Sequence, residues 1–239
     1  MSLWNFFLNL IYPENCHCFK CRKNYIFSEL KGICNDCLEE IEFFQKNCLI
    51  CGRGIFDSGK NHCTYCQEKG FYYDLGRSAG SYSGLLKYLI LEFKYGHNLS
   101  LSAPLGQILF YTYQQYYINE YIDEIIYVPI HKQRYKERGF NQSGLLADIL
   151  SKKTGIPVNK SLKRLKETPP LYNYSFHERE NILKDSFILD NDVFKGKVLL
   201  LVDDIMTTGA TANEISRLLK ETGKARKVFL LTVATSLTY

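Results

Sequence analysis

Apolar residues recur every three or four positions in four stretches of the second part of the chain, which is typical of helices with one buried face. Three of these stretches stop at a glycine, a residue type that commonly ends a helix: Gly96, Gly155 and Gly223. The predicted helices cover residues 85–93, 103–117, 143–152 and 211–222.

Short apolar runs between these stretches predict buried strands over residues 124–128, 197–203 and 227–235. Strands that alternate with helices form a parallel sheet with right-handed crossovers, so we expect an α/β fold with a parallel sheet flanked by helices. The polar, basic residues 131–140 follow the first strand and are predicted to form a loop.

The first part of the chain differs in pattern and composition. Residues 1–75 show little apolar periodicity and hold all nine cysteines, whereas residues 76–239 hold none. A segment of this size with so few core residues needs additional cross-links. We therefore predict two domains, 1–75 and 76–239, with the boundary within residues 71–80.

Composition and charge narrow the class of protein. Of 239 residues, 46% are hydrophobic and 23% are charged, a composition that argues against a disordered chain. The net charge of +5 permits an anionic ligand or a nucleic acid without requiring one. The apolar N-terminus has neither the basic region nor the cleavage site of a secretion signal, and no apolar run approaches the ~20 residues of a membrane helix. We expect a cytoplasmic protein without membrane insertion, whose cysteines form no disulfide framework.

Eight of the nine cysteines form four Cys-x-x-Cys pairs, a spacing that lets two thiolates share one zinc ion. The near-equal spacing favours two consecutive four-cysteine sites. The alternatives are a cross-braced pairing, Cys16 in place of Cys18 in the first site, and His17 or His62 as substitute ligands. Because four thiolates leave no position for water, we expect two structural zinc ions. The favoured ligand sets are Cys18, Cys21, Cys34 and Cys37 for one ion and Cys48, Cys51, Cys63 and Cys66 for the other.

The predicted strand 197–203 ends in two carboxylates, Asp203 and Asp204, and continues into a turn rich in threonine and glycine. Ligands of parallel α/β sheets bind at the carboxyl ends of strands, and the N–H groups of such a turn suit a phosphate. Adjacent carboxylates repel phosphate but accept hydrogen bonds from hydroxyls, so we predict a sugar phosphate. The candidate phosphate-binding residues are Thr207, Thr208, Gly209, Ala210 and Thr211.

The string from Leu199 to Thr211 resembles the phosphoribosyl pyrophosphate motif of type I phosphoribosyltransferases. That resemblance implies that Asp203 and Asp204 hold the ribose hydroxyls and serve catalysis by orienting the sugar, and that the turn holds the 5′-phosphate. It also implies Mg²⁺ bound together with the ligand. The chain lacks the Gly-x4-Gly-Lys-Ser/Thr loop of P-loop ATPases.

The block from Val128 to Ser143, with Arg138-Gly-Phe-Asn-Gln142 inside it, resembles the ComF family of competence-associated proteins. So do residues 82–96 and the early cysteine pairs. The family implies an N-terminal double zinc ribbon, a type I phosphoribosyltransferase domain and a role in DNA uptake during natural transformation. Basic side chains would stabilise the pyrophosphate leaving group. The candidates for that role are Lys94, Lys132, Arg134 and Arg138.

One segment departs in part from the family pattern: Leu171 replaces a glutamine and Tyr174 a leucine, whereas Thr168, Ser175, Glu178 and Arg179 fit the pattern. This segment would cover the sugar where the acceptor binds, so the sequence does not assign an acceptor. Thr207 stands where purine-salvage relatives usually carry an aspartate, which argues against purine salvage. His131 and His177 are candidate proton carriers, with surface histidines as the simpler interpretation.

Two functions follow from these patterns. The first is a phosphoribosyltransferase that binds phosphoribosyl pyrophosphate. The second is a non-catalytic protein that uses this fold as a ligand sensor and binds single-stranded DNA or DNA-uptake proteins. In the second case exposed tyrosines could stack on bases, although core packing is the simpler interpretation. The tyrosines considered are Tyr111, Tyr113, Tyr116, Tyr117 and Tyr135.

Overall fold

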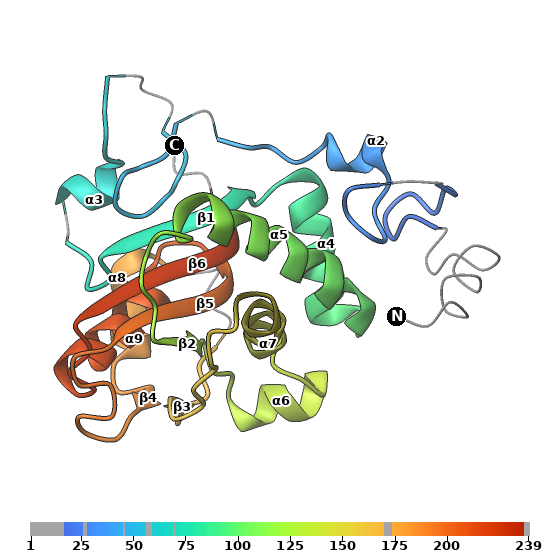
Figure 1. Ribbon diagram of the computed structural model, residues 1–239. Coiled ribbons are helices and arrows are strands. Elements are labelled where there is room, and N and C mark those ends of the chain that lie inside the picture. The colour runs from blue at the N-terminus through green and yellow to red at the C-terminus, as the bar shows by residue number, and fades with distance from the viewer. Residues whose placement is uncertain are drawn as a thin grey trace.

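The fold was analysed in a computed structural model of the chain, shown in Figure 1. The structure describes residues 17–25, 28–44, 46–55, 59–68, 70–169 and 174–236.

A four-stranded parallel sheet forms the centre of the molecule, with strand order β1-β6-β5-β2 (Figure 1). The central strands β5 and β6 are buried along most of their length, as expected for a parallel sheet covered on both faces. All three predicted strands are confirmed. The strands are β1 (Leu75–Ser81), β2 (Glu124–Tyr127), β5 (Val198–Met206) and β6 (Lys227–Thr235).

The edge strand β1 was not predicted from the sequence. Its residues are mostly small and include Gly76 and Gly80, so they carry no apolar alternation. The strand forms because its backbone pairs with β6, which is distant in sequence. Long-range pairing of this kind leaves little local signal.

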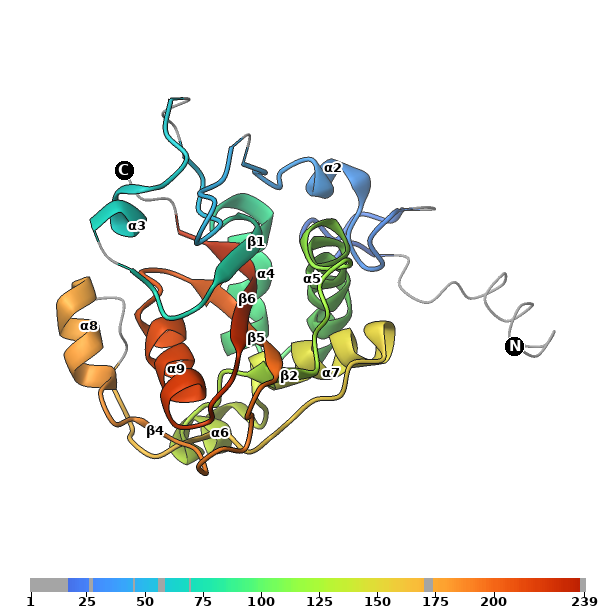
Figure 2. The ribbon, with the colours of Figure 1, turned by 60° about the vertical axis from the view of Figure 1, so that its left-hand side comes forward.

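Helices cover both faces of the sheet (Figure 2). Helices α4, α5 and α7 lie on one face, and α8 and α9 lie on the other. The four predicted helices are confirmed, with ends shifted by a few residues at most. The bounds are α4 (Gly84–Tyr95), α5 (Ser102–Tyr116), α7 (Gln142–Thr154), α8 (Phe176–Leu183) and α9 (Ala210–Glu221), with the short 3₁₀ helix η1 (Leu99–Leu101) before α5.

The predicted loop at 131–140 is wrong, because Lys132–Arg138 forms the helix α6. The His131 side chain caps its first turn, and Gly139 ends it with a φ of 79°. None of the residues of α6 is buried, so the segment lacks the apolar periodicity from which helices are recognised.

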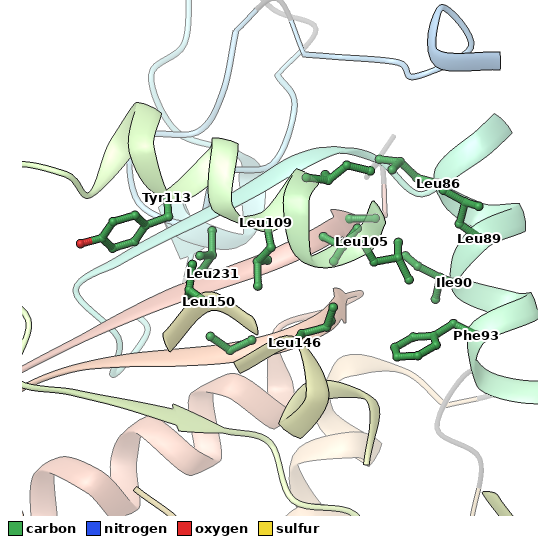
Figure 3. Packing of buried hydrophobic residues seen from close by; sticks show 14 of the residues in the cluster. Leu86, Leu89, Ile90, Phe93, Leu105, Leu109, Tyr113, Leu146, Leu150 and Leu231 are labelled. Carbon is green, nitrogen blue, oxygen red and sulfur yellow. The ribbon is translucent and has the colours of Figure 1, made fainter. Parts of the chain in front are cut away.

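The larger hydrophobic cluster lies between the sheet and the helices α4, α5 and α7 (Figure 3). Phe93 at the end of α4 packs against Phe140, with ring centroids 5.3 Å apart. This contact fixes the end of α4 next to the start of α7. The buried residues labelled in Figure 3 are Leu86, Leu89, Ile90, Phe93, Leu105, Leu109, Tyr113, Leu146, Leu150 and Leu231.

The remaining elements are short. The strands β3 (Lys163–Arg164) and β4 (Phe187–Ile188) pair antiparallel outside the main sheet. The helices α2 (Asn35–Leu38) and α3 (Thr64–Glu68) lie in the cysteine-containing part. Within the described ranges, no helix has the length and apolar character needed to cross a membrane.

Candidate functional site

The predicted phosphate loop, residues 207–211, comprises the turn between β5 and α9 and the first two residues of that helix. Gly209 is the N-cap of α9 and has a φ of 86°, a left-handed conformation that favours glycine. A Cβ atom at Gly209 would also lie 3.2 Å from the ring of Phe71. The loop borders a small cavity of about 30 Å³, lined in part by Thr208, Gly209 and Thr211. The N-terminal end of a helix with such a turn offers N–H donors to an anion.

A larger pocket of about 480 Å³ lies at the carboxyl ends of β2 and β5. Cationic side chains outnumber acidic ones among its lining residues, so the pocket suits a ligand with several negative charges. The acidic side chains of the pocket also suit a ligand with hydroxyl groups, because carboxylates accept hydrogen bonds from hydroxyls. Its charged lining consists of Lys94, Arg134, Arg138, Arg164, Arg179, Glu137, Asp203 and Asp204.

The two adjacent carboxylates of this pocket have different partners. The Ser143 hydroxyl donates to Asp203 Oδ1 at 2.8 Å, and the backbone N–H of Asp204 donates to the same oxygen at 2.9 Å. Lys94 Nζ lies 2.8 Å from Asp204 Oδ1, and these two side chains are 17% and 8% exposed. Lys94 therefore neutralises an acid in this structure, although it was predicted to contact pyrophosphate.

Burial is the largest influence on the pKa of Asp203. It raises the pKa of Asp203 to about 7, and repulsion by Asp204 adds to this rise. Burial alone would lower the pKa of Lys94, but the charges of Asp204 and Asp203 outweigh burial, so the pKa of Lys94 is raised. Lys94 therefore stays charged beside the acids, and Asp203 changes its charge close to neutral pH.

The raised pKa of Asp203 predicts a pH-dependent change in stability. The carboxyl titrates near 3.8 in an ordinary setting and near 7 in the folded chain, so raising the pH through this window disfavours the folded state. The Asp203→Asn variant lacks this titration. We expect its free energy of unfolding, relative to wild type, to increase by about 2–3 kcal/mol between pH 5 and pH 8.

Urea denaturation at several pH values measures this difference. The exposed Asp190 provides the matched control, because Asp190→Asn removes one carboxylate outside the pocket. A pH-independent difference between Asp203→Asn and wild type would contradict the assigned pKa.

The structure brings three of the four predicted cationic residues to the pocket. Arg134 Nη2 donates to the Thr168 carbonyl oxygen at 2.8 Å. Arg138 Nη1 donates to Gln142 Oε1 at 3.2 Å, and its guanidinium lies 5.2 Å from the ring centroid of Tyr95. Lys132 is exposed at the start of α6 and lies outside the lining of the pocket.

Several lining residues were not selected from the sequence. Arg164 comes from the two-residue strand β3, and burial together with Arg134 lowers its pKa to about 10. Arg179 belongs to the family motif, and its Nη1 donates to Thr207 Oγ1 at 2.5 Å. His97 follows α4 with a φ of 52° and also lines the pocket. Only Arg179 had a sequence signal that could have identified it, because Arg164 and His97 reach the pocket through the fold.

The candidate proton carriers lie outside this pocket lining. His131 Nδ1 accepts a hydrogen bond from the Gln133 N–H at 3.3 Å and thereby caps α6. His177 is exposed, with Nδ1 3.6 Å from Glu180 Oε2. The surface interpretation of His177 therefore agrees with the structure, and His131 has a structural partner.

The tyrosines considered for base stacking fall into two groups. Tyr113 and Tyr117 are buried, and the Tyr117 hydroxyl donates to the Leu230 carbonyl oxygen at 2.8 Å. Their interpretation as core residues is correct, and stacking on bases is excluded for them. Tyr111 and Tyr135 are exposed at 49% and 52%. Tyr116 is partly buried, with the Arg77 guanidinium 5.2 Å from its ring centroid.

The eight paired cysteines form two clusters, each with its four Sγ atoms within 4.8 Å of one another. Consecutive pairing is confirmed and the cross-braced alternative is wrong. The clusters include neither His17 nor His62, and Cys16 lies outside the described residues. The two clusters are Cys18, Cys21, Cys34 and Cys37, and Cys48, Cys51, Cys63 and Cys66.

The donor geometry of both clusters fits zinc. Tetrahedral Zn–S bonds of ~2.3 Å place the sulfurs about 3.8 Å apart. The Sγ atoms of Cys21 and Cys34 are 3.6 Å apart, and those of Cys51 and Cys63 are 3.5 Å apart. Each cluster could therefore hold one ion with four thiolates, which suits a structural role.

Comparison with known proteins gives relatives that cover most of the chain, although no family model matches. Competence protein F of Haemophilus influenzae is 32% identical, over 87% of this chain and 93% of that protein. Competence protein ComFC of Bacillus subtilis is 27% identical, over 96% and 88%. DNA utilization protein YhgH of Salmonella typhimurium is 28% identical, over 87% and 92%. A solved adenine phosphoribosyltransferase from Leishmania tarentolae overlaps with 60% of this chain and 75% of its own, at 14% identity and a TM-score of 0.31, which is too low to support an argument.

Proposed function

The chain belongs to the ComF family of competence proteins, and from this premise we propose that it binds phosphoribosyl pyrophosphate with Mg²⁺ and acts in DNA uptake during natural transformation. One observation carries the ligand assignment. Two adjacent carboxylates and a threonine- and glycine-rich turn at a helix N-terminus border a pocket whose charged lining is mainly cationic. Phosphoribosyl pyrophosphate offers a matching group to each feature: ribose hydroxyls for the carboxylates, a 5′-phosphate for the turn and a pyrophosphate for the cationic side chains.

Each part of the ligand has a matching part of the site. The 5′-phosphate would accept hydrogen bonds from the N–H and hydroxyl groups of residues 207–211. The ribose hydroxyls would donate to Asp203 and Asp204. The pyrophosphate would lie near Arg134 and Arg138, whose guanidinium groups suit phosphate oxygens. The volume of about 480 Å³ lies within the ~300–1,000 Å³ typical of small-molecule pockets.

The site also has oxygen donors of the kind that Mg²⁺ prefers. Mg²⁺ usually binds one or two carboxylates together with substrate phosphates, and Asp203 and Asp204 are suitable carboxylates. The ion would neutralise charge on the pyrophosphate oxygens. The two cysteine clusters would hold structural zinc in an N-terminal domain, residues 1–75, that precedes the ligand-binding domain, residues 76–239. A reducing cytoplasm would keep these thiols available for zinc.

As an enzyme, the chain would transfer a phosphoribosyl group to a nucleophilic acceptor, with pyrophosphate as the leaving group. Its residues would contribute by position and charge: the acids orient the sugar, the loop fixes the far phosphate, and the arginines stabilise the leaving group. The acceptor is not assigned, because residues 171–173 of the diverged segment lie outside the described residues.

Calorimetric titration of Mg²⁺–phosphoribosyl pyrophosphate into the zinc-loaded protein tests the ligand assignment. We expect micromolar binding, and weaker binding of ribose 5-phosphate, which lacks the pyrophosphate. Failure of the folded protein to bind phosphoribosyl pyrophosphate would contradict the proposal. Release of pyrophosphate during turnover would then distinguish an enzyme from a ligand sensor.

An exposed feature of α6 favours a second role in binding single-stranded DNA. Tyr135 is 52% exposed and lies between the exposed residues Lys132 and Lys136 on this helix. Cations near an accessible aromatic ring are typical of surfaces on which bases stack. An affinity for a labelled single-stranded oligonucleotide that falls with salt concentration would support this role. An affinity that does not change with salt concentration would contradict it.

A further inference from the structure

The second cysteine cluster is in direct contact with the phosphate loop. Arg53 follows Cys51 by two residues and is 1% exposed. Its Nη2 donates to the backbone carbonyl oxygen of Thr207. Its guanidinium also lies 4.7 Å from the ring centroid of Tyr65, which comes from α3 between Cys63 and Cys66. Arg53 therefore joins the cluster to a residue 154 positions away in the sequence.

The turn that carries Arg53 is held tightly against the edge of the sheet. The Gly76 N–H in β1 donates to the Ile50 carbonyl oxygen at 2.6 Å. Arg77 Nη1 donates to the Leu49 carbonyl oxygen at 3.3 Å. Gly52 has a φ of 75°, and a Cβ atom there would lie 2.5 Å from the Gly76 carbonyl oxygen. A turn seated this closely can fix the direction from which Arg53 reaches the loop.

The bond to Arg53 determines how one peptide of the loop is oriented. In a trans peptide the carbonyl of one residue and the N–H of the next point to opposite sides. The Thr207 carbonyl accepts from Arg53 and also from the Ser236 hydroxyl at 3.1 Å. The N–H of Thr208 is thereby directed away from Arg53. Arg179 holds the Thr207 side chain at the same time.

We propose that Arg53 is a positioning residue for the phosphate loop, through which the second zinc site controls the affinity for the bound phosphate. The inference rests on the proposed function, since it concerns the same site. The first cluster makes different contacts: it packs against α4, where the Tyr88 hydroxyl donates to the Phe19 carbonyl oxygen at 3.3 Å. Loss of the second zinc should weaken ligand binding more than loss of the first.

The test titrates Mg²⁺–phosphoribosyl pyrophosphate into the full-length, zinc-loaded chain. We expect Arg53→Met to keep two zinc ions and to bind about tenfold more weakly, because the loop peptide loses its charged donor. Arg53→Lys retains a cation that can donate to Thr207 and should restore binding to within about threefold of wild type. Arg22→Met is the matched control, because Arg22 is an exposed arginine directly after Cys21 of the first cluster and lies outside the turn that carries Arg53. Its affinity should equal that of wild type.

Two outcomes overturn the inference alone: wild-type affinity in Arg53→Met, or an equal loss of affinity in Arg22→Met. Failure of wild type to bind contradicts the proposed function, and the inference fails with it. If Arg53→Met loses zinc or does not fold, zinc release from the wild-type protein tests the inference instead. Coupling between two sites is reciprocal, so a zinc site that affects ligand affinity must itself be affected by the ligand. Saturating ligand should slow release of one of the two zinc ions to a zinc-binding dye several-fold. Unchanged release of both ions would overturn the inference.

Discussion

The double variant Asp203→Asn/Asp204→Asn is expected to bind Mg²⁺–phosphoribosyl pyrophosphate at least 100-fold more weakly than wild type. Under the proposed function, each carboxylate accepts a hydrogen bond from a ribose hydroxyl, and a hydrogen bond to a charged group contributes about 1.5–3 kcal/mol. Two such bonds exceed the ~2.7 kcal/mol that corresponds to 100-fold. Calorimetry on the zinc-loaded proteins measures the difference.

The single variants separate the two carboxylates. Asp204→Asn also removes the partner of the largely buried Lys94, so its melting temperature should fall. Asp203→Asn keeps that ion pair and should lose binding without loss of stability. Asp190→Asn, an exposed carboxylate outside the pocket, is the control. Wild-type affinity in the folded double variant would contradict the assignment of the ribose hydroxyls to these acids.

The strand, loop and helix that carry the acids were predictable because their signals are local. The apolar run of β5, the two acids, the glycine turn and the amphipathic face of α9 follow one another within 197–222. Each element depends on neighbouring residues, and the turn needs a left-handed residue at one position, which Gly209 provides. The structure of this segment can be predicted from the sequence because its local preferences agree with the fold.

Other parts of the site were not predictable because their determinants are distant in sequence. The helix α6 was not predicted, because it buries none of its residues, although its pocket-lining residues Arg134 and Arg138 were selected from the sequence. Arg164 enters from a two-residue strand that exists only through pairing with β4. Lys94 was selected for its charge, and only the fold shows that its Nζ lies 2.8 Å from Asp204 Oδ1. Charge can be read from a sequence, but the partner of a charge depends on tertiary packing.

Zinc removal is expected to have the largest effect on stability. Four-thiolate zinc binding contributes about 10–16 kcal/mol in small modules, more than a segment with few core residues can replace. Chelation should unfold residues 1–75 and leave the sheet of 76–239 folded. Because both clusters pack into the hydrophobic cores, the melting temperature of the remaining domain should also fall. Circular dichroism and calorimetry during chelation measure both changes.

Cysteine variants test the same prediction one site at a time. Cys37→Ser should remove the first zinc ion and Cys66→Ser the second, because each leaves three thiolates in its cluster. Cys16→Ser is the matched control and should keep two zinc ions, since eight other cysteines complete both sets. A stability loss of 3 kcal/mol would lower the melting temperature by about 6–12 °C in a domain of this size. If Cys37→Ser and Cys66→Ser both have the melting temperature of wild type, zinc does not stabilise this fold.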